Sequence, residues 1–323
     1  MKNILVTGGA GFIGSNFVRY MLEKDFNIVT LDALKYAGSM NNLKDLPNPD
    51  NHIFIYGDIG DDELVKKVLL TLDIDTIVNF AAETHVDRSI NSPDPFMYSN
   101  VMGTFTLLET LRKINKDIRF HQISTDEVFG SLNFYEPAWE EDAPYKPNSP
   151  YSASKAAADH LVRAYGNTYG IQYTISHSSN NYGPRQYPEK LIPLCITNAL
   201  KGLPIPVYGD GEQIRDWVYV LDHCEGIYNI LEKGHLGHSY NLGGNNQSTN
   251  IAMIKRICSL LDDILPAPLP YSSLITFVGD RAGHDRRYAL DNYKAYRTFG
   301  WTPEYDLDEG LYDTIKWCLE VTE

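Results

Sequence analysis

The order of hydrophobic and polar positions divides the first half of the chain into short and long segments. Short β-branched runs predict strands, at 2–7, 27–31, 52–56, 76–80, 118–123 and 172–177. Between them, apolar residues at helical spacing predict helices, at 12–23, 94–114 and 151–169, with one more beginning after Asp61 and a stop at Gly170. Because strands and helices alternate, the pattern predicts an α/β fold with a doubly wound parallel sheet.

The rhythm changes after Asn181. Prolines and glycines cluster between Gly183 and Gly211, and helical patterns recur, at 192–200, 220–232, 250–261 and 307–321. We interpret residues 1–181 as the first domain and residues 182–323 as a smaller C-terminal α/β domain that binds substrate. No low-complexity linker separates the two, so some C-terminal segments are expected to return to the first domain.

Composition describes an acidic globular chain and argues against two kinds of partner. The chain has 323 residues, a hydrophobic content of 43% and a formal net charge of −14, and a negative surface disfavours nucleic acid. No apolar run reaches membrane-spanning length, so no membrane association is expected. Four scattered cysteines indicate a reducing compartment rather than a disulfide framework or a metal site. Since Met1 leads directly into the first strand, we expect no signal peptide and a cytoplasmic location.

A glycine-rich turn joins the first strand to the first helix. Gly8, Gly11 and Gly14 give a Gly-x-x-Gly-x-x-Gly spacing. This spacing permits a tight turn, close approach of backbone amides to a pyrophosphate, and close packing of helix on strand. The motif is weak alone, but its strand–turn–helix context strengthens it. It predicts a dinucleotide site that includes the intervening Phe12 and Ile13.

Asp32, at the end of the second strand, predicts a preference for NAD over NADP. A carboxylate at this point accepts hydrogen bonds from a ribose diol and repels a 2′-phosphate, although the nearby Lys35 acts in the opposite direction. Asp58 and Ile59, after the third strand, are candidates for contacts with the adenine amine and ring. The alternative is a structural glycine turn beside a solvated Asp32.

Two polar segments carry the candidate chemistry. Ser124-Thr125-Asp126-Glu127 follows a predicted strand, and Tyr151 and Lys155 lie four apart on a predicted helix. On one helical face, a lysine ammonium favours the tyrosine phenolate, which then becomes a base for an alcohol proton during hydride transfer. Asp126 and Glu127 add an acid and a base, so we also expect proton transfer at carbon, as in elimination of water. The alternatives are a chance Tyr-x-x-x-Lys spacing and carboxylates that face solvent or cap a helix.

With these motifs the chain resembles the extended short-chain dehydrogenase/reductase family. Three further segments narrow the resemblance to its nucleotide-sugar dehydratases, in particular the dTDP-glucose 4,6-dehydratases: 81–90, 213–217 and 280–288. The similarity spans essentially the whole chain. One departure is Ala282, where the family often has proline, and this changes a loop without removing a functional group.

The resemblance implies an NAD-dependent lyase that converts dTDP-glucose to dTDP-4-keto-6-deoxyglucose without net oxidation. Tyr151 would take the C4 hydroxyl proton while NAD takes the C4 hydride, with Thr125 bonded to the C4 oxygen. Glu127 would remove the C5 proton, Asp126 would protonate the leaving C6 hydroxyl, and the hydride would return to C6. Lys155 would also hold the nicotinamide ribose. Such a product serves deoxysugar biosynthesis, including that of rhamnose.

The resemblance also implies binding residues and an oligomeric state. For the cofactor it adds Ala81, Ala82 and Ser99 to the residues above. For the nucleotide sugar it implies ten residues: Thr84, Asn180, Glu189, Lys190, Leu191, Pro206, Arg215, Asn250, Arg281 and His284. Arg215 could hold the diphosphate in a bidentate contact, or it could form an ion pair with Asp216 instead. The helices at 94–114 and 151–169 pair across a homodimer axis in this family, or here they only cover the sheet.

Other functions remain open at this point. They include a UDP-glucose 4,6-dehydratase, a 4-epimerase or decarboxylase of the same fold, and a non-catalytic NAD-binding regulator. An epimerase needs no acid and base beyond the tyrosine, so Asp126 and Glu127 argue against it. The joint presence of Thr125, Tyr151 and Lys155 argues against a regulator.

Overall fold

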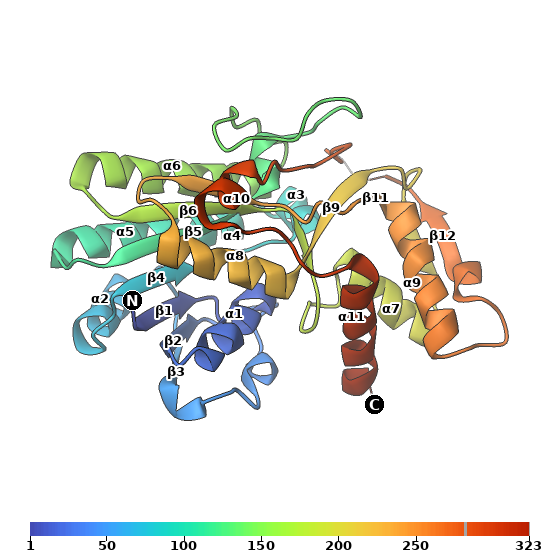
Figure 1. Ribbon diagram of the computed structural model, residues 1–323, viewed down its shortest axis with the longest axis horizontal. Helices are drawn as coiled ribbons and strands as arrows, with labels where there is room; N and C mark the ends of the chain where they lie inside the picture. Colours follow the sequence, from blue (N-terminus) through green and yellow to red (C-terminus); the bar gives the residue numbers. More distant parts are fainter. Residues whose placement is uncertain (281–282, 323) are drawn as a thin grey trace.

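A seven-stranded sheet forms the centre of the protein (Figure 1). In this computed structural model, which describes residues 1–280 and 283–322, the strands lie in the order β10-β6-β5-β4-β1-β2-β3 and neighbouring strands are parallel. Their bounds are β1 Asn3–Thr7, β2 Asn27–Asp32, β3 His52–Tyr56, β4 Thr76–Asn79, β5 Arg119–Thr125, β6 Tyr173–Ser178 and β10 Ser239–Leu242. The predicted doubly wound parallel sheet is therefore confirmed.

Helices cover both faces of this sheet, as Figure 1 shows. Successive residues of β1 alternate between the faces: Ile4 and Val6 belong to one apolar core and Leu5 to the other. The first core lies under α1 (Phe12–Glu23) and α8 (Val220–Lys233). The second lies under α2 (Asp62–Thr71), α5 (Gly103–Ile114) and α6 (Pro150–Tyr169).

Local signals fix the ends of these helices. The Asp61 side chain caps α2 by accepting a hydrogen bond of 3.0 Å from the backbone nitrogen of Leu64. Ser149 and Ser152 form a reciprocal capping box at the start of α6, with Pro150 as its first residue. Gly170 ends α6 in the left-handed region, with a φ of 74°. The predicted cap at Asp61 and the predicted stop at Gly170 are both confirmed.

The helix predicted at 94–114 is not uniform. It begins as α4 (Asp94–Phe96), continues through a π-helical segment at Met97–Met102, and becomes α5. Within the π segment, Asn100 donates to the Glu83 carbonyl at 3.0 Å and to the Ser154 hydroxyl at 2.8 Å. These bonds tie the segment to α6 and to the loop after β4, where the short helix α3 (Val86–Asn91) follows. π segments occur often at functional sites, and apolar spacing does not reveal them.

The second half of the chain builds a smaller unit beside the sheet. It contains a three-stranded sheet in the order β11-β9-β7 and a two-stranded sheet of β12 and β8. These strands are β7 Asn180–Tyr182, β8 Ile205–Tyr208, β9 Ile214–Tyr219, β11 Gln247–Thr249 and β12 Ile275–Val278. Three helices enclose a separate apolar core with them: α7 Leu191–Leu200, α9 Asn250–Ile264 and α11 Leu307–Thr322.

Parts of this second half return to the first sheet. β10 pairs with β6, and α8 packs against α1. The remaining elements are α10 (Tyr293–Phe299) and four short 3-10 helices, at Met40–Leu43, Pro49–Asn51, Asp126–Phe129 and Tyr271–Leu274. Among the helices of residues 1–280 and 283–322, none is both long and apolar enough to cross a bilayer.

Candidate active site

A cavity of about 550 Å³ lies where the sheet meets the smaller unit. It opens at the C-terminal ends of the strands, where open α/β sheets bind ligands. All predicted site residues within the described chain line it, namely Gly8, Gly11, Phe12, Ile13, Gly14, Asp32, Lys35, Asp58, Ile59, Ala81, Ala82, Thr84, Ser99, Thr125, Asp126, Glu127, Tyr151, Lys155, Asn180, Glu189, Lys190, Leu191, Pro206, Arg215, Asn250 and His284. Arg281 lies outside the described residues.

The glycine turn forms a cradle of bare backbone at one end of the cavity. Gly8 has a φ of +68°, and a Cβ there would lie 2.6 Å from the backbone nitrogen of Ala81. A Cβ on Gly14 would lie 2.3 Å from the Gly8 carbonyl oxygen, and one on Gly11 would lie 3.2 Å from it. Since α1 begins at Phe12, its first amides lie beside this space. The cradle therefore fits a pyrophosphate at a helix N-terminus.

Asp32 is held in place at the end of β2 rather than solvated. Its side chain is buried, and its two oxygens accept bonds from the backbone nitrogens of Ala10 and Leu34 at 2.9 and 2.8 Å. Burial raises the pKa of Asp32, while these two bonds and the charge of Lys35 oppose the rise. Lys35 itself forms an ion pair with Asp58 at 3.0 Å. A fixed carboxylate beside the phosphate cradle fits the ribose diol of NAD.

Asp126 is a buried acid at the start of the 3-10 helix after β5. Thr125 donates to its Oδ1 at 3.1 Å, while Oδ2 has no hydrogen-bond partner among residues 1–280 and 283–322. Burial raises the pKa of Asp126 well above its usual range, and the neighbouring charge of Glu127 adds to the effect. Burial thus favours the protonated form of Asp126, which suits it to donate a proton.

Tyr151 and Lys155 lie on the first turns of α6, and both are buried. The Lys155 ammonium donates to the carbonyl of Ile123 at 2.6 Å, and burial lowers the pKa of Lys155 to about 8. Burial, followed by the charge of Glu127, raises the pKa of Tyr151 well above its usual value, against a hydrogen bond with Thr125. A phenolate at Tyr151 therefore needs positive charge nearby, and Lys155, four residues further along α6, is the candidate for it.

The smaller unit contributes the opposite wall. Arg215, on β9, is buried and donates to the carbonyls of Ile214 and Asp285 at 2.8 and 3.0 Å, with its guanidinium over the Tyr288 ring. The Asp216 carboxylate instead accepts bonds from the backbone nitrogens of Gly244 and Asn246, at 2.9 and 2.7 Å. The alternative of an Arg215–Asp216 ion pair is therefore wrong. Asn250 Oδ1 is buried without a hydrogen-bond partner in the described part of the chain.

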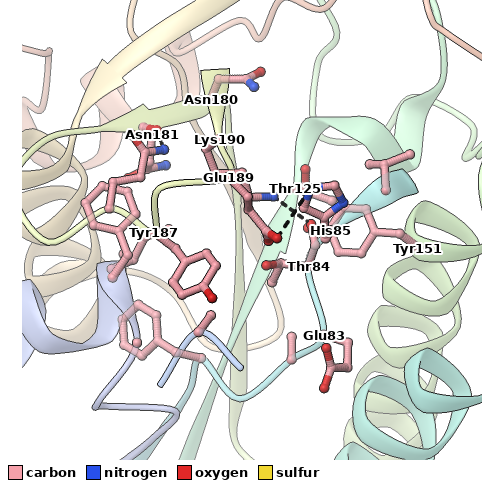
Figure 2. Close-up of a pocket in the computed structure, with 18 of the residues that line it drawn as sticks. Glu83, Thr84, His85, Thr125, Tyr151, Asn180, Asn181, Tyr187, Glu189 and Lys190 are labelled. Atoms are coloured by element: carbon pink, nitrogen blue, oxygen red, sulfur yellow. Dashed lines mark hydrogen bonds and ion pairs between the residues drawn. The ribbon is translucent and has the colours of Figure 1, made fainter. Parts of the chain in front are cut away.

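A loop of the smaller unit reaches across the cavity to the first sheet (Figure 2). Lys190 donates to the carbonyl of Thr84 at 3.0 Å. Glu189 lies 3.3 Å from the Arg88 guanidinium and 3.7 Å from His85. His85 and Arg88 were not predicted as site residues, although both lie in the segment 81–90 that carried the resemblance.

Several aromatic and polar residues of the cavity were also not predicted. They are contributed by loops and by short strands, and include Tyr36, Asn181, Tyr187, Tyr208, Trp217 and Tyr288. Tyr36 and Tyr187 meet edge to face, with ring centroids 5.5 Å apart. No spacing signal in the sequence marks such residues, since the tertiary fold brings them together.

Comparisons with known proteins agree with this geometry. A family model described as GDP-mannose 4,6 dehydratase matches residues 5–314. The chain is 50% identical to dTDP-glucose 4,6-dehydratase of Xanthomonas campestris pv. campestris (strain B100), over 99% of this chain and 93% of that protein.

Two solved structures are similar over nearly their whole length. One is dTDP-glucose 4,6-dehydratase from Bacillus anthracis in complex with NAD, with a TM-score of 0.88 and 46% identity over 99% of this chain and 97% of that one. The other is the Streptomyces venezuelae enzyme with NAD bound, with a TM-score of 0.91 and 44% identity over 98% and 97%. The chain therefore belongs to the GDP-mannose 4,6 dehydratase family, within which these relatives are dTDP-glucose 4,6-dehydratases.

Proposed function

We propose that the protein is a dTDP-glucose 4,6-dehydratase, a hydro-lyase that uses NAD without net oxidation. One arrangement carries the proposal: a buried acid with a raised pKa, Asp126, lies beside Glu127 in the same cavity as the Tyr151–Lys155 pair. An alcohol dehydrogenase or an epimerase has no use for the first two groups, whereas elimination of water requires both an acid and a base. The identities of the relatives support the same substrate.

Residues of the first sheet would hold the cofactor. Gly8, Gly11 and Gly14 leave space for the pyrophosphate, Asp32 would bind the adenosine ribose, and Lys155 the nicotinamide ribose. When bound, NAD supplies the hydride acceptor for oxidation at C4 and the hydride donor for reduction at C6. The carboxylate of Asp32 disfavours the 2′-phosphate of NADP.

The protein side chains move the protons. Tyr151 takes the proton of the C4 hydroxyl, and Thr125 hydrogen-bonds the C4 oxygen. The ketone at C4 makes the C5 proton acidic, and Glu127 removes it. Asp126 gives its proton to the C6 hydroxyl, which leaves as water, and C5 is reprotonated after reduction at C6. Asp126 suits its step because burial raises its pKa and so favours the form that carries a proton.

The smaller unit would bind the nucleotide and its diphosphate. Arg215 is a fixed, buried cation on the cavity wall, and guanidinium groups bind phosphates in a bidentate manner. The remaining predicted substrate contacts on this wall are Asn180, Glu189, Lys190, Leu191, Pro206, Asn250 and His284. Residues 1–181 would therefore act mainly on the cofactor, and residues 182–323 mainly on the nucleotide sugar.

We also propose a homodimer, a cytoplasmic location and a place in deoxysugar biosynthesis such as that of rhamnose. The face of α5, α6 and the adjoining π segment exposes Tyr98, Met102 and Tyr169, at 73%, 49% and 53% of their surface. A helix-pair interface would bury these side chains. The four cysteines are buried, and no disulfide joins them within the described part of the chain, which fits a reducing compartment.

An isotope experiment tests the proposed reaction. dTDP-glucose with deuterium at C4 should give a 4-keto-6-deoxy product with one deuterium at C6, because the same hydride is removed and returned. Unlabelled substrate in heavy water should gain deuterium at C5, where Glu127 exchanges its proton with solvent. A label that returns to C4 would indicate an epimerase, and a label lost to free NADH a simple dehydrogenase. UDP-glucose, assayed in parallel, would report the nucleotide preference.

A further inference from the structure

A buried polar cluster lies next to the strand and the helix that carry the candidate chemistry, β5 and α6. Its centre is Asp159, on α6, whose side chain is fully buried. Oδ2 of Asp159 accepts hydrogen bonds from Ser124 at 2.6 Å and Tyr145 at 3.0 Å, and lies 3.6 Å from Nε2 of His177. None of these four residues has a place in the reaction described above.

Asp159 follows Lys155 by one helical turn. Residues four apart lie on the same helical face, and the charge of the Asp159 carboxylate acts on the buried Lys155 ammonium. Oδ1 of Asp159 is buried and has no hydrogen-bond partner among the residues that the structure describes. The negative charge of the carboxylate is therefore only partly satisfied by direct contacts. In a water-poor interior such a charge acts strongly on a neighbouring cation.

Lys155 needs a partner of this kind. Its ammonium is buried and donates to the carbonyl of Ile123, an uncharged acceptor. A buried ammonium without a counter-charge tends to lose its proton. A neutral Lys155 could not favour the phenolate of Tyr151, and the proposed oxidation at C4 would lose its base.

We propose that Asp159 is a positioning residue for the reaction, the internal counterion that keeps Lys155 an ammonium while Tyr151 is a phenolate. This role rests on the proposed function, because it acts on the base that oxidises C4. Ser124, Tyr145 and His177 then serve to hold the carboxylate in its charged form and in place.

The electrostatics of the two groups agree with this role. Burial lowers the pKa of Lys155 to about 8, and the charge of Asp159 opposes that fall. Burial alone would raise the pKa of Asp159, but the hydrogen bond and charge of His177, the charge of Lys155 and the Ser124 hydroxyl bring it below its usual value. Asp159 is thus ionised at the pH at which Lys155 needs a partner.

Other charged groups face the cluster and the base. Arg163 donates to the Tyr145 hydroxyl at 3.0 Å. Glu141, in the loop before Tyr145, is also near enough for the charge of His177 to act on it. On the other side, Tyr151 faces Glu127, whose charge raises the pKa of Tyr151 further after burial, and Asp126 and Tyr36, which raise it when they are ionised. Tyr151 and Lys155 together hold one exchangeable proton, so a loss of Asp159 moves the pair from phenolate–ammonium toward phenol–amine.

A titration of the Tyr151 phenolate tests the role independently of turnover. The phenolate absorbance of the NAD-loaded protein is followed against pH, and the signal of Tyr151 is the difference from a matched protein with Tyr151→Phe. In Asp159→Asn we expect the midpoint of the Tyr151 phenolate titration to move up by about one pH unit or more. A shift of this size is usual when a neighbouring opposite charge is gained or lost. C4 oxidation at neutral pH, measured as the single-turnover rate of NADH formation, should fall about tenfold, with its acid limb moved to higher pH.

Two variants separate charge from hydrogen bonding. Asp159→Glu keeps the charge, so the phenolate midpoint should lie close to that of wild type. Tyr145→Phe removes one hydrogen bond but leaves the carboxylate, so the midpoint should move little. Asp62→Asn, an exposed acid on α2, is the control for loss of a carboxylate elsewhere. Asp159→Ser, which leaves room for water beside Ser124, is measured in parallel in case Asp159→Asn does not fold.

A double substitution tests the route through Lys155. In a Lys155→Met background, Asp159→Asn should leave the midpoint unchanged or lower it, since only the direct repulsion of the phenolate is then removed. The counterion role would be overturned if Asp159→Asn raised the phenolate midpoint equally with Lys155 and with Lys155→Met. It would also be overturned if neither Asp159→Asn nor Asp159→Ser raised the midpoint in the otherwise wild-type protein. If the wild-type protein shows the phenolate behaviour but no turnover of dTDP-glucose, the proposed function fails while the role of Asp159 stands.

Discussion

A hydrogen bond from Thr125 makes the two carboxyl oxygens of Asp126 unlike. Its hydroxyl donates to Oδ1 at 3.1 Å, whereas Oδ2 is buried with no hydrogen-bond partner among the described residues. In the protonated carboxyl, the proton is therefore best placed on Oδ2. This leaves the acidic proton available to a ligand in the cavity, while Oδ1 fixes the orientation of the group.

Asp126→Asn should slow loss of the C6 hydroxyl more than oxidation at C4. An amide cannot give up a proton as a carboxylic acid does, and general acids contribute about 10²–10⁴-fold. Rapid-quench analysis of the sugar should then show a C4-oxidised species that persists. A substrate with fluorine at C6, which leaves without strong acid assistance, should be much less affected. An equal loss with both substrates would remove Asp126 from this step.

The same substitution should change the pH dependence of stability. Burial raises the pKa of Asp126 in the folded state, so the group contributes stability below the pKa of an unfolded aspartate. That stability is lost as pH rises through the folded pKa. Asp126→Asn removes this ionisation, so its melting temperature relative to wild type should rise with pH. Thermal melts from acid to alkaline pH would measure the difference, and parallel curves for the two proteins would contradict the assignment.

Tyr151→Phe keeps the ring but removes the group that accepts the C4 proton. Oxidation at C4 should fall by about 10²–10⁴-fold, the usual contribution of a general base. The glycine cradle and Asp32 are untouched, so NAD should bind as in wild type. Single-turnover NADH formation and NAD titration measure the two effects. Near-normal oxidation by this variant would show that another group is the base.

Glu127→Gln should separate the two halves of the reaction. C4 oxidation remains, because Tyr151 and the cofactor site are intact, but the C5 proton has no acceptor. Enzyme-bound NADH should accumulate, with little water lost and little exchange of C5 hydrogen with solvent. Stopped-flow absorbance and deuterium incorporation would follow these events. Normal dehydration would exclude Glu127 as the C5 base.

Gly14→Ala should abolish tight NAD binding, with a loss of stability as well. The added Cβ would lie 2.3 Å from the Gly8 carbonyl oxygen and 2.9 Å from the Gly9 Cα, so the turn must move. Overpacking of this kind typically costs about 1–3 kcal/mol. Gly279→Ala is the matched control, because its Cβ would meet no atom of the described residues within 4 Å. Calorimetric NAD titration and thermal melts of both variants test the expectation, which fails if the two behave alike.

The first half of the fold could be predicted closely. In the second half the four predicted helices are confirmed as α7, α8, α9 and α11, but the short strands could not be predicted. Strands such as β4 (Thr76–Asn79) were predicted because buried parallel strands have continuous apolar, β-branched runs, and helix ends because Asp61 and Gly170 act locally. β3 (His52–Tyr56), expected to be buried as well, is instead a partly exposed strand at the edge of the sheet. β7 and β11 have three residues each, with polar sequences, so their pairing with β9 depends on the folded chain.

The candidate site shows the same division. Position at the end of a predicted strand or the start of a predicted helix was enough to indicate three site residues, and each lines the cavity: Asp32, Asp126 and Tyr151. Asp159 lies only one turn beyond Lys155, but the role proposed for it depends on contacts with His177 and Tyr145, which lie in other segments of the chain. Counterions and supporting hydrogen bonds of this kind are properties of the folded chain.

The pairing of β10 with β6 has a consequence for truncated forms of the chain. A fragment that ends at residue 181 would present the unpaired backbone of β6 as an open sheet edge, a template for intermolecular strand addition. It would also uncover the apolar side of α1, which α8 covers. The first 181 residues should therefore aggregate when expressed alone, and the complete protein should melt in a single cooperative transition.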